Sequence, residues 1–427
     1  MSLTSLIFAS FLAASSPNKS LVVKTNEIVN SPKESAHLQV ATTTQESFYS
    51  SEKSSELATE LESNPSHEED QIIITIPKPK TTNPHNSKVD PIMPLELLIV
   101  SQTEGEDFAD DRPEFAKEGE KVILYAVVKA KDKDGKTVFY TEAPKLKINN
   151  KKISPAQIIS PKDIGRSLEW FKLEPAGENY NNKRNDKFKL EKIDYAQTLF
   201  TEGWSAQANS HPTILYDAFK HLKTGLGVMR YQLTFTDSQG KEFSTPGIEC
   251  RSKGGLCDKV HKVAFREDNG NWTDYAFELF NSPYIWGSIG KQVDRQIGVD
   301  CADLVVYAKR RHQEETSGKK RQPYTWSYGL EKYTNTIVEF DGADIWGNPL
   351  ADGKLVKFNE TVQEGDILLF PRHAAILYKD SSIKGVEGTL DAYDLAIHTL
   401  FNEPEIISIG DISSQVGPPL KILRWKK

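Results

Sequence analysis

The sequence predicts a multidomain protein with a disordered N-terminal tether, an all-β sandwich and a C-terminal α+β domain. Three observations lead to this order. Residues 1–92 lack sustained apolar periodicity, the middle of the chain has short alternating runs joined by turns, and the last third combines a capped helix with several strands. The length of 427 residues exceeds one ordinary domain, and the mean hydropathy of −0.51 is low for a chain that packs throughout.

The first 16 residues have the pattern of a signal peptide. An apolar run over 3–14 is followed by small residues suited to a cleavage site, although no Lys or Arg precedes the run. An ordinary, uncleaved start of the chain is the alternative. Residues 17–92 are rich in Ser, Thr, Asn, Glu and Lys, a composition that cannot bury enough surface to offset its conformational entropy. We therefore expect export and a disordered linker over 17–92.

Residues 93–257 carry the alternating apolar runs of an antiparallel sandwich of immunoglobulin-like type. The segments 131–136 and 237–241 place Asp and Gly between runs of β-branched and aromatic residues, which is typical of hairpin turns. Short strands separated by such turns favour a sandwich. The segment 211–227 is an exception, because its pattern predicts a helix between two strands.

Charge and hydropathy exclude some classes of partner. The net charge of −7, with no long basic run, argues against nucleic acid. No apolar run reaches the roughly 18 residues that a transmembrane helix needs. We expect no cofactor and no metal ion, and the sequence leaves the oligomeric state open.

The three cysteines separate into a pair and a single residue. Cys250 and Cys257 flank a loop with two glycines, and a disulfide between them would close a loop of about eight residues. Zinc thiolates are the alternative, but they need two more ligands, and His261 is the nearby candidate. A disulfide fits an exported protein and leaves Cys301 as the free thiol.

Cys301 falls in the first turn of a predicted helix over about 301–311. Asp300 is suited to the N-cap, and Asp303 can complete a capping box. The basic residues 309–311 fit the C-terminal end of the helix dipole. At the N-terminal end, the dipole and free backbone N–H groups are expected to lower the pKa of the thiol and can bind an oxyanion. For a lone cysteine, a buried structural role is the alternative.

Two histidines follow on predicted strands. An antiparallel sheet would let His373 and His398 face each other across neighbouring strands. A single strand histidine is usually a core residue, but two of them after a cysteine at a helix start favour a nucleophile with a base. The strands expected here are 367–371, 373–378, 394–401, 405–409 and 420–424.

Four motifs occur in order along this part of the chain. They are Pro-Tyr-Ile-Trp-Gly over 283–287, Asp-Cys-Ala-Asp-Leu-Val over 300–305, Gly-Asp with an apolar run over 365–370 before His373, and Ala-Ile-His over 396–398. Residues from about 262 to 427 thereby resemble the NlpC/P60 family, papain-like cysteine peptidases that act on bacterial cell-wall peptides. The resemblance predicts a catalytic domain over 258–427.

The resemblance implies a role for each matching residue. Cys301 would be the nucleophile, His373 the base that later protonates the leaving amine, and His398 the residue that orients His373. The hydroxyl of Tyr284 would help bind the oxyanion. Asp300 and Asp303, on either side of the nucleophile, are the remaining residues expected at the substrate.

The chain departs from the family pattern next to the nucleophile. The family's Ser-Gly after the cysteine is Ala302-Asp303 here, and Ser288 stands where a second glycine is usual. These changes put the family's usual substrate, a γ-D-glutamyl-diaminopimelate bond, in question. Asp303 has two interpretations: it caps the helix, or it faces the cleft and favours a substrate amine.

We therefore predict an exported, extracytoplasmic cysteine hydrolase that cleaves amide bonds in peptidoglycan peptides through a thioester. Four alternatives stay open. They are an amidase with a different substrate, a catalytically impaired wall-binding or surface-adhesion protein whose sandwich carries the function, a zinc site built from Cys301, His373 and His398, and a redox-active thiol.

Overall fold

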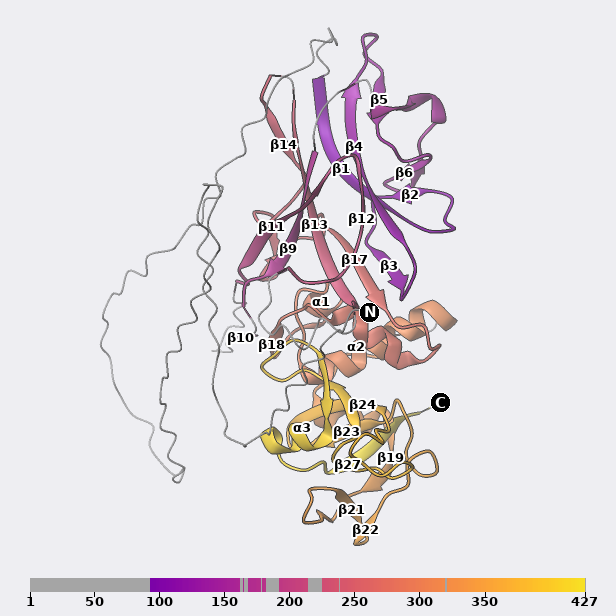
Figure 1. Cartoon of the computed structure of the whole chain (residues 1–427), viewed down its shortest axis with the longest axis vertical. Helices are drawn as coiled ribbons and strands as arrows, with labels where there is room; N and C mark the ends of the chain where they lie inside the picture. The colour runs from indigo at the N-terminus through magenta and orange to yellow at the C-terminus, as the bar shows by residue number, and fades with distance from the viewer. Residues whose placement is uncertain are drawn as a thin grey trace, which may run out of the picture. The chain divides into compact units, whose positions relative to one another are not determined.

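The computed structural model describes residues 93–427 except 162–163, 165–167, 178, 182–191, 214–224, 238, 319–320 and 427. The expected signal peptide and linker, and most of the helix expected over 211–227, lie outside the described residues. The described part is mostly β-sheet with few helices (Figure 1), which confirms the predicted fold class at that level.

Two sheets pack face to face in the first half of the described chain (Figure 1). The eight-stranded sheet contains β1 (Met93–Thr103), β2 (Ala109–Asp110), β4 (Val122–Lys131), β5 (Thr137–Tyr140), β6 (Leu146–Ile148), β7 (Lys151–Lys152), β8 (Ile158–Ile159) and β12 (Ser205–Gln207). The six-stranded sheet contains β3 (Glu114–Lys117), β9 (Leu168–Pro175), β11 (Tyr195–Glu202), β13 (Gly227–Thr236), β14 (Glu242–Ser244) and β17 (His261–Arg266).

Alternation along the strands explains why the two sheets pack together. In β1, Leu97 and Ile99 point into the core between the sheets, whereas Val100 packs into a separate cluster on the other face. Tyr231 and Leu233 of β13 enter the same core from the opposite sheet. Successive strand residues point to opposite faces, so each strand supplies every second residue to this core.

Both expected hairpin turns are confirmed, and in each an aspartate side chain accepts a backbone N–H from the residue four positions later. In the turn between β4 and β5, the Oδ1 atom of Asp132 accepts the N–H of Lys136 over 2.8 Å. In the turn between β13 and β14, Oδ1 of Asp237 accepts the N–H of Lys241 over 2.9 Å. Gly135 and Gly240 take the positive φ values of 78° and 81° that the reversals require.

The six-stranded sheet extends past the boundary expected at residue 257. β17 pairs with β13 on one side and with β3 on the other, so residues 261–266 belong to the sandwich rather than to the following domain. The disulfide between Cys250 and Cys257 is confirmed, with Cα atoms 5.3 Å apart. It joins the ends of a small hairpin, β15 (Arg251–Ser252) and β16 (Gly255–Leu256), before β17.

A second six-stranded sheet forms the C-terminal part. Its order is β19 (Thr334–Glu339), β27 (Lys421–Trp425), β23 (Ile367–Phe370), β24 (His373–Lys379), β25 (Leu395–His398) and β26 (Glu405–Ser408). The strands expected over 367–424 are therefore confirmed. Figure 1 shows helix α2 (Cys301–Ser317) beside this sheet, and α2 contacts β24. Leu304 and Val305 of α2 share one hydrophobic core with Ala374 and Ile376 of β24.

The remaining elements are short. They are η1 (Pro155–Gln157), β10 (Asn179–Asn181), η3 (Trp272–Leu279), β18 (Tyr284–Trp286), α1 (Gly290–Val293), η4 (Ser327–Lys332), β20 (Gly342–Ala343), β21 (Pro349–Ala351), β22 (Lys354–Leu355) and α3 (Ile409–Val416). Strand β10, from the sandwich part, pairs in parallel with β18.

Helix α2 is longer than expected. It ends at Ser317, and Gly318 adopts a φ of 58° as its C-cap. The basic residues 309–311 therefore lie in mid-helix rather than at the C-terminal end. Arg311 is used for a different purpose, because its Nε lies 2.8 Å from the fully buried carboxylate of Glu278 in η3. This ion pair ties α2 to η3.

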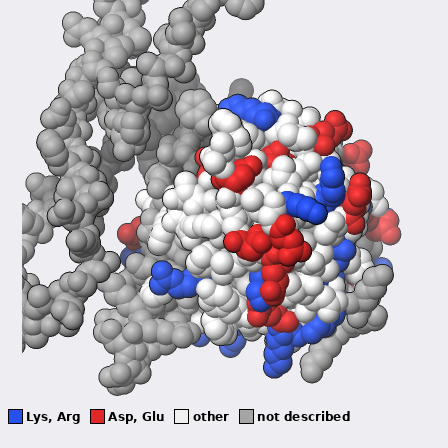
Figure 2. Space-filling model, turned by 90° about the horizontal axis from the view of Figure 1, so that it is seen from below, with Lys and Arg blue, Asp and Glu red and all other residues white. Residues whose placement is uncertain are grey.

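The surface of the C-terminal part carries charges of both signs. Figure 2 shows acidic and basic side chains interspersed among uncharged residues on one face. Within the described ranges, no helix is both long and apolar enough to span a bilayer.

The sandwich is joined to the segment that leads to Cys301 by a buried guanidinium. Arg230 of β13 is 1% exposed and donates hydrogen bonds to the backbone carbonyl oxygens of Asn281, over 3.3 Å, and of Gln296. The ring of Tyr195 lies 5.8 Å from the guanidinium carbon. Burial lowers the pKa of Arg230, which reflects the cost of removing this cation from water.

Replacing this guanidinium should destabilise the fold strongly. We expect Arg230→Ala to lower the free energy of unfolding by about 3–5 kcal/mol, because two buried carbonyl oxygens lose their donors and a cavity remains. Denaturant unfolding measures this. Arg112→Ala, which removes an exposed partner of Asp110, serves as the control and should cost about 1 kcal/mol or less. Equal effects of the two substitutions would contradict the role given to Arg230.

Candidate active site

Cys301 is the first residue of α2, and its helix start is capped as expected. The backbone N–H of Asp303 donates to Oδ1 of Asp300 over 3.0 Å. The side chain of Cys301 is 9% exposed, and it is the free cysteine among the described residues. The thiol thus lies at the N-terminal end of the helix, within the core rather than on the surface.

The expected lowering of the thiol pKa is wrong for this structure. Burial raises the pKa of Cys301 to about 12, and the negative charge of Asp300 adds to this rise. The backbone N–H groups of Ala374 and Ala302 act in the opposite direction but do not compensate. Desolvation of the thiolate therefore outweighs the helix dipole.

His373 and His398 are brought together as the strand pattern predicted. Nε2 of His373 lies 3.1 Å from Nδ1 of His398, and the two rings are perpendicular. They come from the antiparallel neighbours β24 and β25. His373 is 1% exposed and His398 is fully buried. Burial and the neighbouring His398 lower the pKa of His373 to about 3, so the imidazole at rest is neutral.

The thiol lies beside the strand that carries His373. The backbone N–H of Ala374, the next residue, lies near enough to the sulfur of Cys301 to lower the pKa of the thiol. The other ring nitrogen of His373, Nδ1, is buried and has no hydrogen-bond partner among the described residues. Nδ1 is therefore the nitrogen that remains for the thiol, although no hydrogen bond joins the two at rest. Such contacts are often loose before substrate binds.

A further carboxylate contacts the histidine pair, and the sequence interpretation missed it. Glu405 lies opposite His398 in the register of β25 and β26, with its Oε1 3.4 Å from Nε2 of His398. It is 3% exposed. The sequence contained a signal for this contact. The strands over 394–401 and 405–409 were both predicted, and a hairpin between them places His398 opposite Glu405.

Ser288 and Asp303, two residues that depart from the family pattern, contact each other. The hydroxyl of Ser288 donates to Oδ2 of Asp303 over 2.6 Å and accepts the N–H of Asp300 over 3.1 Å. The expected capping box is therefore bridged by a serine instead of closing directly. Asp303 is 5% exposed, so it does not face an open cleft. Burial and the adjacent charge of Asp300 raise the pKa of Asp303.

Asp300 is half-buried. Burial raises its pKa to about 6, while backbone N–H groups of Asp303, Ala302, Gly287 and Ser288 counteract the rise. One buried and one half-buried carboxyl group thus lie beside the thiol. Their arrangement favours sharing of protons within the network over a free anionic patch.

Tyr284 begins β18 and is 3% exposed. Burial, with the charges of Cys301 and Asp300, raises the pKa of Tyr284. The phenol therefore stays protonated and can donate a hydrogen bond. Its ring packs edge-on against Phe401, 5.5 Å away between centroids.

Exposed aromatic rings contact residues next to this site. Phe401, beside Tyr284, is 59% exposed. On the side of the base, the hydroxyl of Tyr328 accepts the N–H of Arg372, the residue before His373, over 3.2 Å. Trp326 lies 5.4 Å from Tyr328 between ring centroids and is 68% exposed. Solvent-exposed aromatic groups of this kind are typical of binding surfaces.

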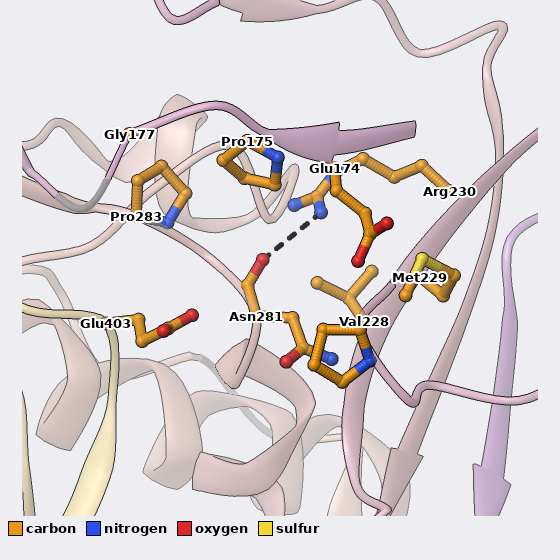
Figure 3. A pocket seen from close by; sticks show the side chains of 10 residues that line it. Glu174, Pro175, Gly177, Val228, Met229, Arg230, Asn281, Pro283 and Glu403 are labelled. Carbon is orange, nitrogen blue, oxygen red and sulfur yellow. Dashed lines mark hydrogen bonds between the residues drawn. The ribbon is translucent and has the colours of Figure 1, made fainter. Parts of the chain in front are cut away.

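Two cavities lie elsewhere. Figure 3 shows a small pocket next to the hydrogen bond from Arg230 to Asn281, lined also by Glu174, Pro283 and Glu403. Its volume of about 30 Å³ is far below the size of a ligand pocket. A cavity of about 670 Å³ lies in the sandwich, between the start of β1 and β14, and contains none of the expected site residues.

Comparison of the chain with protein-family models, curated proteins and solved structures finds no match. The resemblance to the NlpC/P60 family therefore stays a prediction that depends on the four motifs. Within the described part of the chain, no group of three or more His, Cys, Asp or Glu side chains has an arrangement that could hold a metal ion.

The raised pKa of the thiol predicts how Cys301 reacts. Above about pH 3 the imidazole of His373 is neutral, and well below pH 12 the thiol of Cys301 is neutral, with the thiolate a minor species. We expect the rate of alkylation by iodoacetamide to rise about tenfold per pH unit from pH 7 to 10, as the thiolate fraction does. Mass spectrometry of labelled protein measures this rate, with Cys301→Ala as the unlabelled control. A constant rate from pH 6 to 8 would instead reveal a thiolate–imidazolium pair at rest.

The contact between Ser288 and Asp303 predicts a coupling free energy. We expect Ser288→Ala and Asp303→Ala each to lower the free energy of unfolding, and the double variant to cost less than their sum by about 1–2 kcal/mol. The reason is that either substitution alone removes the same hydrogen bond. Ser288→Ala combined with Ser408→Ala, which removes the N-cap of α3, is the matched control and should be additive. Additivity in the first pair would mean that the two side chains do not interact.

Proposed function

We propose that the protein is an exported cysteine hydrolase that cleaves amide bonds in peptidoglycan peptides. One observation carries the proposal: a free thiol at the start of α2 lies against the strand of a buried His373–His398 pair. In this proposal the C-terminal part is a papain-like domain of NlpC/P60 type, and the sandwich is immunoglobulin-like. The order of a helix-start cysteine followed by two strand histidines supports this assignment.

The chemistry would follow from these positions. Nδ1 of His373 takes the proton of the Cys301 thiol as sulfur attacks the carbonyl carbon of the scissile amide. The resulting oxyanion would be stabilised by backbone N–H groups at the start of α2 and by the phenol of Tyr284. His373 then donates its proton to the leaving amine, which departs and leaves a thioester on Cys301.

Water completes the reaction. His373 removes a proton from a water molecule, which attacks the thioester and releases a carboxylic acid and the thiol. Since the resting thiol and imidazole are both neutral, proton transfer would accompany attack rather than precede it. His398 keeps the ring of His373 in place during both steps through the 3.1 Å contact.

The surroundings support a peptide substrate with bulky neighbours. Phe401, which packs against Tyr284, and Trp326, which packs against Tyr328, offer exposed rings. Asp303 is bonded to Ser288 and enclosed, so recognition of a substrate amine by Asp303 is not part of the proposal. The disulfide between Cys250 and Cys257 supports an oxidising, extracytoplasmic location.

A second candidate function is wall binding by a catalytically impaired domain. It is favoured by the burial of Cys301 and by the missing hydrogen bond from its thiol to His373. In that case the sandwich would carry the function.

Digestion of purified peptidoglycan, followed by mass analysis of the fragments, separates the two functions. We expect Cys301→Ala and His373→Ala to abolish release of peptide fragments, a loss of at least about 10³-fold. Lys354→Ala, an exposed change in β22, is the control and should release the same fragments as the wild type. Wall degradation that survives in Cys301→Ala would refute the hydrolase, whereas wall binding without any fragments in the wild type would favour the second candidate.

A further inference from the structure

The hairpin of β25 and β26 places a carboxylate, Glu405, next to the His373–His398 pair. Glu405 faces His398 in the strand register, with Oε1 3.4 Å from Nε2. Both side chains are shielded from solvent, since Glu405 is 3% exposed and His398 is fully buried. In such surroundings a carboxylate affects its neighbours more strongly than in water.

A carboxylate at this position favours one arrangement of the protons on the two histidines. An ionised carboxylate accepts hydrogen bonds and cannot donate them, so a neutral His398 is favoured with its proton on Nε2, toward Glu405. Nδ1 of His398 then carries a lone pair and accepts from Nε2–H of His373 over 3.1 Å. A neutral imidazole has one N–H, and Nδ1 of His373 is therefore left unprotonated.

An independent observation agrees with this assignment. Two buried ring nitrogens of the pair lack a hydrogen bond among the described residues: Nε2 of His398, which has Glu405 as its ion-pair partner, and Nδ1 of His373. The thiol of Cys301 lies beside the strand of His373. An unprotonated nitrogen in this position can take the proton of the thiol. The opposite tautomer would place an N–H there and remove the base.

We propose that Glu405 is a positioning residue that fixes the tautomers of His398 and His373 so that Nδ1 of His373 is the base. It also offsets the positive charge that the pair gains when His373 takes the proton. The proposal rests on the proposed function for the reaction, but the tautomers are a property of the protein without substrate.

The burial of Glu405 supports a role beyond packing. Placing a carboxylate in a buried strand position costs free energy that an apolar residue would not cost. The 3.4 Å distance to Nε2 is an ion-pair contact, longer than a good hydrogen bond. It is expected to shorten when His398 shares positive charge, because the carboxylate then faces a cation.

Nitrogen NMR of the full chain labelled with ¹⁵N-histidine tests the proposal directly. Two-bond proton–nitrogen correlations at neutral pH distinguish the two tautomers, and His373→Gln and His398→Gln assign the signals. We expect both histidines of the wild type to carry the proton on Nε2. A wild-type His373 protonated on Nδ1 would overturn the proposal without the need for any variant at Glu405.

Two variants at Glu405 separate its charge from its shape. In Glu405→Met we expect His373 to populate the Nδ1–H tautomer and kcat on peptidoglycan peptides to fall about 10–100-fold with little change in KM. In Glu405→Gln the amide oxygen still accepts from His398, so the tautomers should persist. Unchanged tautomers in Glu405→Met would overturn the proposal.

The control is Glu387→Gln, an exposed carboxylate in the segment between β24 and β25. It should change neither the tautomers nor kcat. The NMR measurement of the tautomers requires no substrate, so the two proposals fail separately. Wild-type protein with the expected tautomers but no peptidoglycan cleavage would refute the substrate and leave the role of Glu405 intact. Cleavage of peptidoglycan by a protein whose His373 is protonated on Nδ1 would refute the role of Glu405 and leave the proposed function intact.

Discussion

The guanidinium of Arg230 lies at the point where the sandwich contacts the segment that leads to the nucleophile. Its two carbonyl partners, Asn281 and Gln296, flank the strand of Tyr284 and the loop before Cys301. The same region is fixed from the sandwich side by Gly227, whose Cβ position would clash with Phe280 at 2.7 Å, so only glycine fits there. The position of the proposed site therefore depends on the β13 strand, and the sandwich acts as part of its framework.

Burial governs the chemistry of the site more than the helix dipole does. The thiol, the imidazole of His373 and both nearby carboxyl groups are all shifted toward their neutral forms. In such a site, charged groups stabilise the resting state little. Its reactivity depends on which nitrogen and oxygen atoms carry protons and which present lone pairs. The direction of the hydrogen bonds between Ser288 and Asp303 and between His373 and His398 thus matters more here than net charge.

Local signals account for what the sequence predicted correctly. The Asp132 and Asp237 turns, the Asp300 cap and the strands around His373 each depend on residues within a few positions. Contacts between distant segments were not predictable in this way. The burial of Arg230, the pairing of β17 with the sandwich and the meeting of Ser288 with Asp303 depend on which elements pack together. The pKa of Cys301 was misjudged for the same reason, because desolvation comes from the surrounding fold. The strands β20–β22 also lacked a recognisable pattern.

The pairing of β17 has a consequence for how this protein could have evolved. Modular enzymes exchange accessory domains easily when few contacts cross the boundary. Here β17 completes the six-stranded sheet, and one continuous hydrophobic core runs from β1 to β27. A recombination event near residue 258 would remove a strand from one partner and expose apolar surface on the other. The sandwich and the thiol-bearing part are therefore expected to have been inherited together, as a single unit of descent.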